Sequence, residues 1–413
     1  MLHRKADRLL LLVTALYFLS SLLQGPVSDA EAEGVMHLRI GDAVLSPPMV
    51  LSGDSPHYLV VVNSLIEDWD FDVSNNYDQA ERGDWDTGAR FRRDRLDHHV
   101  DQGPDGRQYS YHAPFLPMML APFVLPLRGT RWVEPACIWI VMTVTLAAIW
   151  YFGRKTGDDA RWAALLALGT PLWCYARDLW TEPWAAAAWI GVLFCESLPV
   201  LAILAFLGTL IRYPLFLPLL VMAGCAFWQG DKRRAIVLIG SSTAALFVAI
   251  GVIQLIFSDV GHFSLLHFGA HVSAPGSSAL VGAPFSIRFD GLFGLLGHPK
   301  DGLLPFFPFL IWGFLQFRKG GYRYLPAVAF FLLNASYDAW GAGTGFSARY
   351  LLPMIPVLIL AVQDARPRDW LFKLAVLWSL GFGFVAGIYP ALAYDRSPWQ
   401  MIRHVWLHLA NKG

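Results

Sequence analysis

The run Gly53-Asp54-Ser55-Pro56-His57-Tyr58 holds the first side chains that suit chemistry. Asp54 precedes an apolar stretch of helical character, residues 58–62, so its carboxylate could cap a helix by accepting hydrogen bonds from the first free amides. A carboxylate there could instead act as a general base on an acceptor hydroxyl. Because His57 and Tyr58 add polar groups beside it, we expect Asp54 to be catalytic and its two neighbours to contact substrate.

Three carboxylates follow at a spacing of two, Asp68, Asp70 and Asp72. On an extended chain they would share one face, which suits a divalent cation because such ions prefer hard oxygen ligands. A solvated acidic turn is the alternative. Asn76 and Tyr77 come next and add groups that hydrogen-bond to a sugar. We expect Asp72, Asn76 and Tyr77 to bind substrate, and a divalent cation is the only cofactor that the sequence suggests.

Two further histidine motifs lie downstream. His98 and His99 have carboxylates on both sides, but adjacent histidines cannot easily share one metal ion. His112 follows two tyrosines that suit the boundary of a bilayer, and we expect it to face the same cavity as Asp54.

Cations suited to a phosphate come later in the chain, at Arg212, Lys300 and Arg349. They fall near the outer ends of predicted membrane spans, where a charged group either faces a polar partner or snorkels to the interface. A guanidinium can contact a phosphate in bidentate fashion. The other expected substrate contacts at this end are Glu182, Asp301 and Tyr350.

The elements that must position these residues are apolar. Of the 413 residues, 55% are hydrophobic and only 15% are charged, whereas a soluble domain carries about 25% charge. The apolar residues form runs near the roughly 20 residues that cross a bilayer. The sequence therefore predicts an all-α polytopic membrane protein. A formal net charge of zero gives no argument for a nucleic-acid partner, and the four cysteines, all inside apolar runs, suit helix packing.

The Lys and Arg clusters set the orientation, because cytoplasmic loops are enriched in them. With residues 3–8 inside, about 11 transmembrane helices place every compact basic cluster on the cytoplasmic side and the C-terminus outside. Residues 1–24 could alternatively be a signal peptide; we prefer an uncleaved first span. The expected spans are about 9–25, 133–152, 162–178, 183–196, 198–212, 213–229, 234–257, 301–317, 323–338, 348–364 and 370–391.

Two large loops, 26–132 and 258–300, are then external, and more than half of the 32 acidic residues lie in residues 26–112. The segment 114–127 is short and holds four prolines, which remove donors that lipid cannot replace. We expect it to form a short interfacial or re-entrant helix, with a kinked span as the alternative. Residues 1–413 form one membrane-embedded domain with no separate soluble domain.

In order and sidedness, these motifs resemble the GT-C fold membrane glycosyltransferases, in the branch of bacterial aminoarabinose transferases and protein O-mannosyltransferases. The resemblance runs over nearly the whole chain. One departure is Ser55, where members usually have a bulkier or acidic residue. The matching runs are Gly53-Asp54-Ser55-Pro56-His57-Tyr58-Leu59, Asp70-Phe71-Asp72-Val73-Ser74-Asn75-Asn76-Tyr77, Tyr109-Ser110-Tyr111-His112-Ala113-Pro114-Phe115-Leu116-Pro117, Trp180-Thr181-Glu182-Pro183, Leu210-Ile211-Arg212-Tyr213-Pro214, Lys300-Asp301-Gly302-Leu303-Leu304 and Phe346-Ser347-Ala348-Arg349-Tyr350-Leu351-Leu352-Pro353.

The resemblance implies an inverting transferase in the plasma (bacterial inner) membrane. It would take a sugar from a polyprenyl-phosphate donor on the outer face and pass it to a hydroxyl of a lipid, glycan or protein. Asp54 falls on the family's catalytic carboxylate, and Arg212, Lys300 and Arg349 would hold the donor phosphate.

Two other function classes fit a chain of this composition. A transporter or flippase of lipid-linked sugars would need ionisable residues at mid-span depth. A non-catalytic envelope-assembly subunit would have no reason to place Asp54 near the three cations in an outer cavity, so the position of Asp54 separates these classes.

Overall fold

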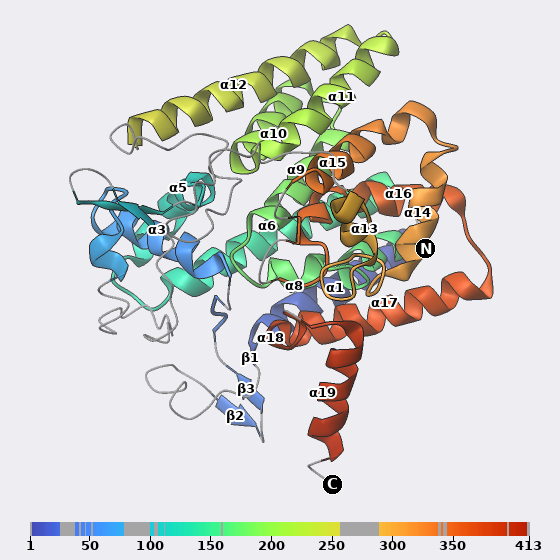
Figure 1. The fold of residues 1–413 in the computed structure, drawn as a ribbon, viewed down its shortest axis with the longest axis horizontal. Coiled ribbons are helices and arrows are strands. Elements are labelled where there is room, and N and C mark those ends of the chain that lie inside the picture. The colour runs from blue at the N-terminus through green and yellow to red at the C-terminus, as the bar shows by residue number, and fades with distance from the viewer. Residues whose placement is uncertain are drawn as a thin grey trace.

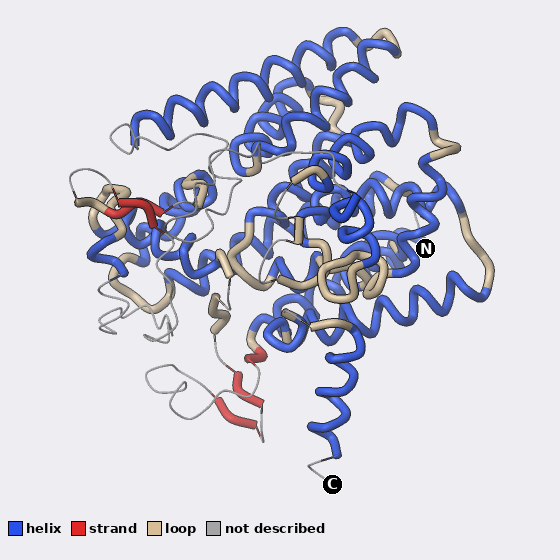
Figure 2. Tube along the Cα trace, in the orientation of Figure 1, coloured by secondary structure: helices blue, strands red, loops and turns tan. Residues whose placement is uncertain are grey.

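A computed structural model describes residues 2–24, 38–40, 43–45, 47–50, 53–77, 100–102, 106–110, 112–157, 160–256, 289–337, 340–341, 345–394 and 396–410. Most of these residues are helical (Figures 1 and 2), which confirms the all-α class. His98, His99 and most of the loop 258–300 lie outside the described residues.

The helices and strands follow one another in a simple order. The α-helices are α1 (Leu2–Ser21), α3 (Ser55–Glu67), α5 (Phe115–Val124), α6 (Val133–Lys155), α7 (Arg161–Leu168), α8 (Leu172–Ala176), α9 (Thr181–Phe194), α10 (Leu198–Ile211), α11 (Phe216–Trp228), α12 (Lys232–Ile256), α13 (Phe289–Gly297), α14 (Ile311–Phe317), α15 (Leu325–Ala335), α16 (Ile355–Ala365), α17 (Trp370–Ile388), α18 (Pro390–Ala393) and α19 (Pro398–Ala410). The 3-10 helices are η1 (Leu125–Leu127), η2 (Tyr213–Leu215), η5 (Pro308–Leu310), η6 (Gly321–Tyr324) and η7 (Arg349–Met354). The strands are β1 (Leu23–Gln24), β2 (Leu38–Ile40), β3 (Ala43–Leu45), β4 (Val100–Gln102) and β5 (Gln108–Ser110).

Among the described helices, α6, α12 and α17 are long and apolar enough to cross a bilayer. Shorter apolar helical segments accompany them, at Phe115–Leu127, Leu198–Ile211, Tyr213–Trp228 and Pro308–Phe317. The expected total of about 11 spans therefore stays a prediction.

The centre of the molecule is α9, which packs against α6, α10 and η7. In Figure 1, α10, α11 and α12 lie along one side of it, and α1, α8 and α17 lie along the other. The largest buried side chains of this core include Trp173, Trp180 and Trp189. One hydrophobic cluster joins α1, α6–α11 and α14–α17, so the apolar runs of the sequence do build a single helical core.

The expected span 162–178 is broken into α7 and α8 by Gly169, Thr170 and Pro171. Proline cannot donate to the preceding turn, so the helix stops and restarts there. α17 presses directly against this break: a Cβ atom on Gly383 would collide with the Leu168 carbonyl. The break is thus a packed feature of the core.

Proline also shortens two other expected spans. Residues 301–307 form turns, and helix begins only with η5 at Pro308. The span expected from residue 348 starts as the 3-10 helix η7, which contains Pro353, and becomes α-helical at Ile355. In both places the missing donor of proline favours the tighter or non-helical conformation.

The segment 114–127 is helical, as α5 followed by η1. α5 packs against α3, and the two share a small hydrophobic cluster with the start of α6. Short strands near them were not predicted: β3 pairs antiparallel with both β1 and β2, and β4 pairs with β5. Two or three residues per strand are too few for a readable alternation.

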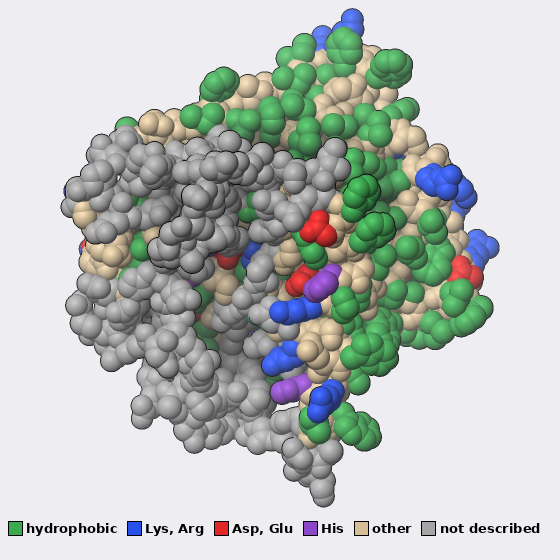
Figure 3. All heavy atoms as spheres, in the orientation of Figure 1, with side chains coloured by type: hydrophobic (Ala, Val, Ile, Leu, Met, Phe, Trp, Pro, Cys, Tyr) green, Lys and Arg blue, Asp and Glu red, His purple; other side chains and the backbone are tan. Residues whose placement is uncertain are grey.

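The C-terminal end of α6 and the residues just after α9 carry exposed ion pairs. Arg154 bonds to Asp7 at 2.9 Å, and Lys155 bonds to Glu196 at 3.1 Å. Arg234 donates to the last carbonyls of α9, the favourable place for a cation at a helix C-terminus. Figure 3 shows Lys and Arg side chains at the top and right margins, with hydrophobic side chains between them. These contacts join the ends of α1, α6, α9 and α12, and their cytoplasmic location stays a prediction.

Candidate functional site

Asp54 stands immediately before α3, which it enters with a helical backbone (φ −78°, ψ −16°). Its side chain makes no capping hydrogen bond. Instead Oδ2 lies 3.3 Å from Nη1 of Arg349, and the side chain remains 17% exposed. Asp54 is thus an accessible carboxylate directed at a buried cation, and its geometry does not support the capping alternative.

Arg349 opens η7 after Ser347, whose backbone is left-handed at φ 57°. The Arg349 side chain is only 2% exposed, so it does not snorkel to an interface. Its Nε lies 3.3 Å from Oε1 of Glu182, and its guanidinium lies 4.3 Å from the centre of the Trp180 ring. Two carboxylates and an aromatic face therefore fix this cation from three directions.

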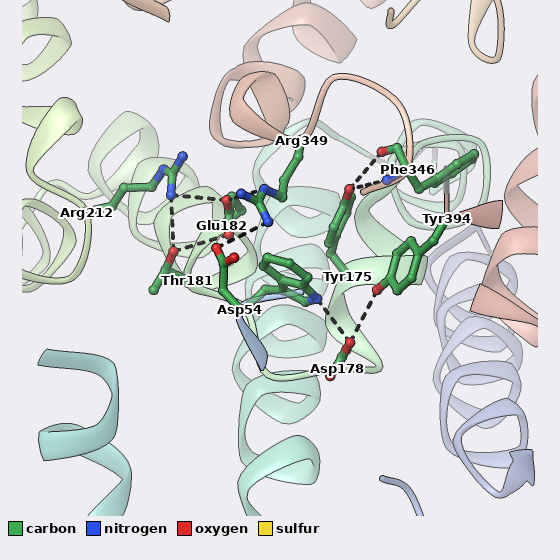
Figure 4. A network of polar contacts seen from close by, with 10 residues as sticks. Asp54, Tyr175, Asp178, Thr181, Glu182, Arg212, Phe346, Arg349 and Tyr394 are labelled. Carbon is green, nitrogen blue, oxygen red and sulfur yellow. Dashed lines mark hydrogen bonds and ion pairs between the residues drawn. The ribbon is translucent and has the colours of Figure 1, made fainter. Parts of the chain in front are cut away.

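Glu182 also binds the second cation, Arg212. Nη1 of Arg212 lies 3.1 Å from Oε1 of Glu182 and 3.2 Å from Oγ1 of Thr181, which itself donates to Oε2 of Glu182. Glu182 lies in the first turn of α9, where the helix dipole favours an anion, and Arg212 follows the last residue of α10. Figure 4 shows Arg212 and Arg349 both directed at Glu182, with Asp54 joined to Arg349.

The Tyr350 ring lies against both guanidiniums, 5.2 Å from that of Arg212 and 5.1 Å from that of Arg349. Two cations and two carboxylates leave this cluster formally neutral. Nε and Nη1 of Arg349 have their carboxylate partners at 3.3 Å, whereas Nε of Arg212 makes no hydrogen bond within the described structure. A buried donor without a hydrogen bond costs about 1–3 kcal/mol, so an oxyanion that accepts from Nε of Arg212 would be stabilised here.

A further carboxylate, that of Asp178, contacts the cluster through Trp180. Asp178 is fully buried, and its Oδ2 accepts from the indole N–H of Trp180 at 3.1 Å and from the hydroxyl of Tyr394 at 3.3 Å. Trp180 therefore has its indole N–H bound by Asp178 and its ring face against Arg349. The expected site did not include Trp180 or Tyr394; for Trp180 the available signal was its place beside Glu182 at a helix start.

Histidine and tyrosine side chains form a buried group on α3 and its neighbours. Nδ1 of His57 lies 2.5 Å from the hydroxyl of Tyr77, and its ring stacks on that of His112 with centroids 5.1 Å apart. The Tyr58 ring lies 5.4 Å from His112. Burial, followed by the carboxylates of Asp54 and Glu182, raises the pKa of the Tyr58 phenol well above its usual range, so this hydroxyl stays a hydrogen-bond donor.

The carboxylates of Asp68, Asp70 and Asp72 accept hydrogen bonds within and around the turn that follows α3. Oδ1 of Asp72 accepts from the backbone and hydroxyl of Ser74 and from the Gln108 amide, and Oδ2 of Asp68 accepts from the Asn76 side chain at 3.0 Å. Oδ1 of Asp70 accepts from the Ser64 hydroxyl. Across the described residues no group of three His, Cys, Asp or Glu side chains could hold a metal ion. Asp72 and Asn76 thus hold an acidic turn together, and their expected contacts with substrate stay predictions.

Lys300 and Asp301 lie in a separate turn. Oδ2 of Asp301 pairs with Nδ1 of His298 at 2.8 Å. This turn touches the loop that leads to Arg349, because the hydroxyl of Ser347 donates to the Gly302 carbonyl. The expected binding of a donor phosphate by Lys300 stays a prediction.

The structure thus brings together Asp54, Tyr58, Glu182, Arg212, Arg349 and Tyr350, with His57, Tyr77 and His112 beside Tyr58. These side chains come from six separate segments and meet at one end of α9. The arrangement can bind an oxyanion between two guanidiniums next to an accessible carboxylate. In the comparisons with known proteins, no family model, no curated protein and no solved structure matches this chain.

Proposed function

We propose that the protein is an integral-membrane glycosyltransferase that moves a sugar from a polyprenyl-phosphate donor to a hydroxyl acceptor at the outer face. The observation that carries the proposal is Asp54, a carboxylate that is accessible, makes no cap and lies 3.3 Å from a buried guanidinium. A carboxylate that can accept a proton and a cation that can bind the departing phosphate therefore lie side by side.

The reaction follows from that pair. The acceptor oxygen attacks the anomeric carbon while the bond from this carbon to the phosphate oxygen breaks. Asp54 takes the acceptor proton, and the phosphate leaves on the polyprenol with an added negative charge. Arg349 and Arg212 stabilise that charge, which is the kind of fixed electrostatic contribution that is large in enzymes. The sugar carbon passes through oxocarbenium character and inverts.

The sidedness of the ion pairs supports an outer site. Glu182 lies in the first turn of α9 and pairs with Arg349. At the other end of α9, Arg234 donates to a carbonyl of the last turn, and Glu196, which pairs with Lys155, follows the helix. The 14 residues of α9 separate these groups by about 20 Å. Since compact basic clusters remain cytoplasmic, the Asp54 end faces outward, and the N-terminus lies inside.

A transporter of lipid-linked sugars fits less well. Such a protein needs ionisable side chains along a path at mid-span depth. The buried charged residues of the described structure are Glu134, Arg177, Asp178, Glu182 and Arg349. Each lies at the end of a helix or just beyond it, which suits chemistry at an interface.

Transfer itself is the first test. Mass spectrometry of envelope glycans and lipids, with and without the gene, should reveal one missing sugar, which defines donor and acceptor. The purified full chain in liposomes should then transfer that labelled sugar from its polyprenyl phosphate with inversion. Movement of the labelled lipid across the bilayer without transfer would establish the transporter instead.

Topology gives a second, independent test. Single cysteines near Asp86 and Ser277, in a chain lacking the native cysteines, should react with an impermeant reagent added outside intact cells. Labelling only after permeabilisation would overturn the outer placement of residues 26–132 and 258–300, and with it the proposed site.

A further inference from the structure

The C-terminal helix α19 stands apart from the helical core. Its first turn is held by Pro398 and Met401, which are buried, and Met401 joins the main hydrophobic cluster. Beyond that turn the helix projects from the body and runs across the direction of α17 (Figure 1). Its 13 residues extend only about 20 Å, which is too short to cross the roughly 30 Å bilayer core.

One side of α19 is an exposed apolar stripe made by Trp399, Ile402 and Trp406, which are 72%, 41% and 70% exposed. Their spacings of three and four place them on one helix face. Arg403 and the exposed Leu407 border this face, and His404 is exposed opposite it. Figure 3 shows hydrophobic side chains along one edge of this projecting part, and basic and histidine side chains along the other.

The stripe continues onto a helix that is apolar enough to cross a bilayer. The ring of Trp399 lies 6.1 Å from that of Trp378 in the middle of α17. On α17, Leu374 and Leu377 are themselves more than half exposed. Trp378 precedes the end of α17 at Ile388 by about 15 Å along the helix. α19 therefore starts beside the lipid-facing flank of α17 and not in the water beyond its end.

We propose that α19 is an interfacial helix that lies in the outer leaflet, with Trp399, Ile402 and Trp406 among the acyl chains and Arg403 and His404 toward the headgroups. Tryptophan rings favour this boundary, and an arginine next to an apolar face can reach a phosphate. A bilayer that covers the exposed apolar flank of α17 would also cover the stripe on α19, so one occupant accounts for both surfaces. The proposal rests on the membrane placement of α17, not on the transferase activity.

Depth measurements test it directly. Nitroxide labels at Trp406→Cys and His404→Cys, in the full chain without native cysteines and in nanodiscs of phosphatidylethanolamine and phosphatidylglycerol, should differ in collision accessibility. The label at 406 should favour oxygen over a water-soluble nickel chelate, and the label at 404 should show the reverse. Equal access of the chelate to both positions would make α19 a free arm, and exclusion of both reagents from 406 would reveal a protein partner; either result overturns the proposal.

Two controls separate the possible failures. A label at Leu377→Cys must favour oxygen; chelate access there would reject the membrane placement of α17, and with it the proposed transferase. A Trp406→Glu variant should raise chelate access at Ile402→Cys severalfold without lowering the unfolding temperature, because Trp406 is exposed and does not pack in the core. No change in access at position 402 would also contradict the proposal.

Discussion

Two aspartates precede helices at opposite ends of the molecule, and they are used differently. Asp369 precedes α17 with an extended backbone (φ −68°, ψ 161°), and its Oδ1 accepts from the Phe372 amide at 2.8 Å. Asp54 precedes α3 with a helical backbone and no capping bond, and it faces Arg349. The same residue type at the same helix position is therefore structural at one end and available for chemistry at the other.

The ion pairs at the two ends also differ, because those near Asp369 are exposed and those near Asp54 are buried. At the Asp369 end the pairs are exposed; the side chains of Arg154 and Asp7 are 59% and 38% exposed. At the Asp54 end, Arg349 and Glu182 are each 2% exposed. Exposed pairs contribute about 0–1 kcal/mol, whereas breaking a buried pair costs several. Burial thus decides where a charge substitution matters.

The largest effect should come from Arg349→Ala. It leaves the Asp54 and Glu182 carboxylates without their shared cation, and removing one partner of a buried pair costs about 3–5 kcal/mol. We expect a clear drop in unfolding temperature in detergent, together with loss of transfer. Arg349→Lys should keep most of the stability but impair donor use, because it keeps the charge and loses the two-pronged geometry. Unchanged donor kinetics in Arg349→Lys, with only a mild effect of Arg349→Ala, would remove Arg349 from the site.

Next in size is Asp54→Asn, for which Asp369→Asn is the matched control. Asparagine caps a helix about as well as aspartate but cannot take a proton. We expect transfer to fall by about 10²–10⁴-fold at position 54, the usual contribution of a general base. The unfolding temperature should fall less than for Arg349→Ala, because Arg349 keeps its pair with Glu182. Asp369→Asn should retain transfer. Near-normal activity of Asp54→Asn would mean that Asp54 has no catalytic role.

A smaller effect is expected from Trp180, which positions Arg349. Trp180→Leu removes the aromatic face, and a desolvated cation–π contact contributes about 2 kcal/mol, or about 30-fold in rate. Trp180→Phe keeps a face and should restore most of the turnover. The measurement is kcat and KM for the donor. Equal losses in the Phe and Leu variants, matched by equal losses of stability, would mean that Trp180 only fills space.

The sequence predicted the helical class, because apolar runs leave a strong local pattern. Among its isolated charges it singled out residues that the structure brings together, such as Asp54, Glu182 and Arg349. Their roles, and the sidedness of the basic clusters, stay predictions. The sequence failed where tertiary contacts decide. The break at Pro171 depends on its close contact with α17, and the role of Asp72 depends on Ser74 and Gln108. The link from Tyr394 to Asp178 spans more than two hundred residues, so no local spacing could indicate it.

The smallest effect is expected from the exposed ion pair between Arg154 and Asp7. Arg154 bonds to Asp7 at 2.9 Å, as close as any pair at the site. Because both side chains are solvated, a double-mutant cycle of Arg154→Ala and Asp7→Asn should give a coupling of at most about 1 kcal/mol, decreasing with added salt. Transfer should be unaffected. A coupling as large as the loss from Arg349→Ala would mean that distance, and not burial, governs these pairs, and the contrast between the two ends would then have no energetic basis.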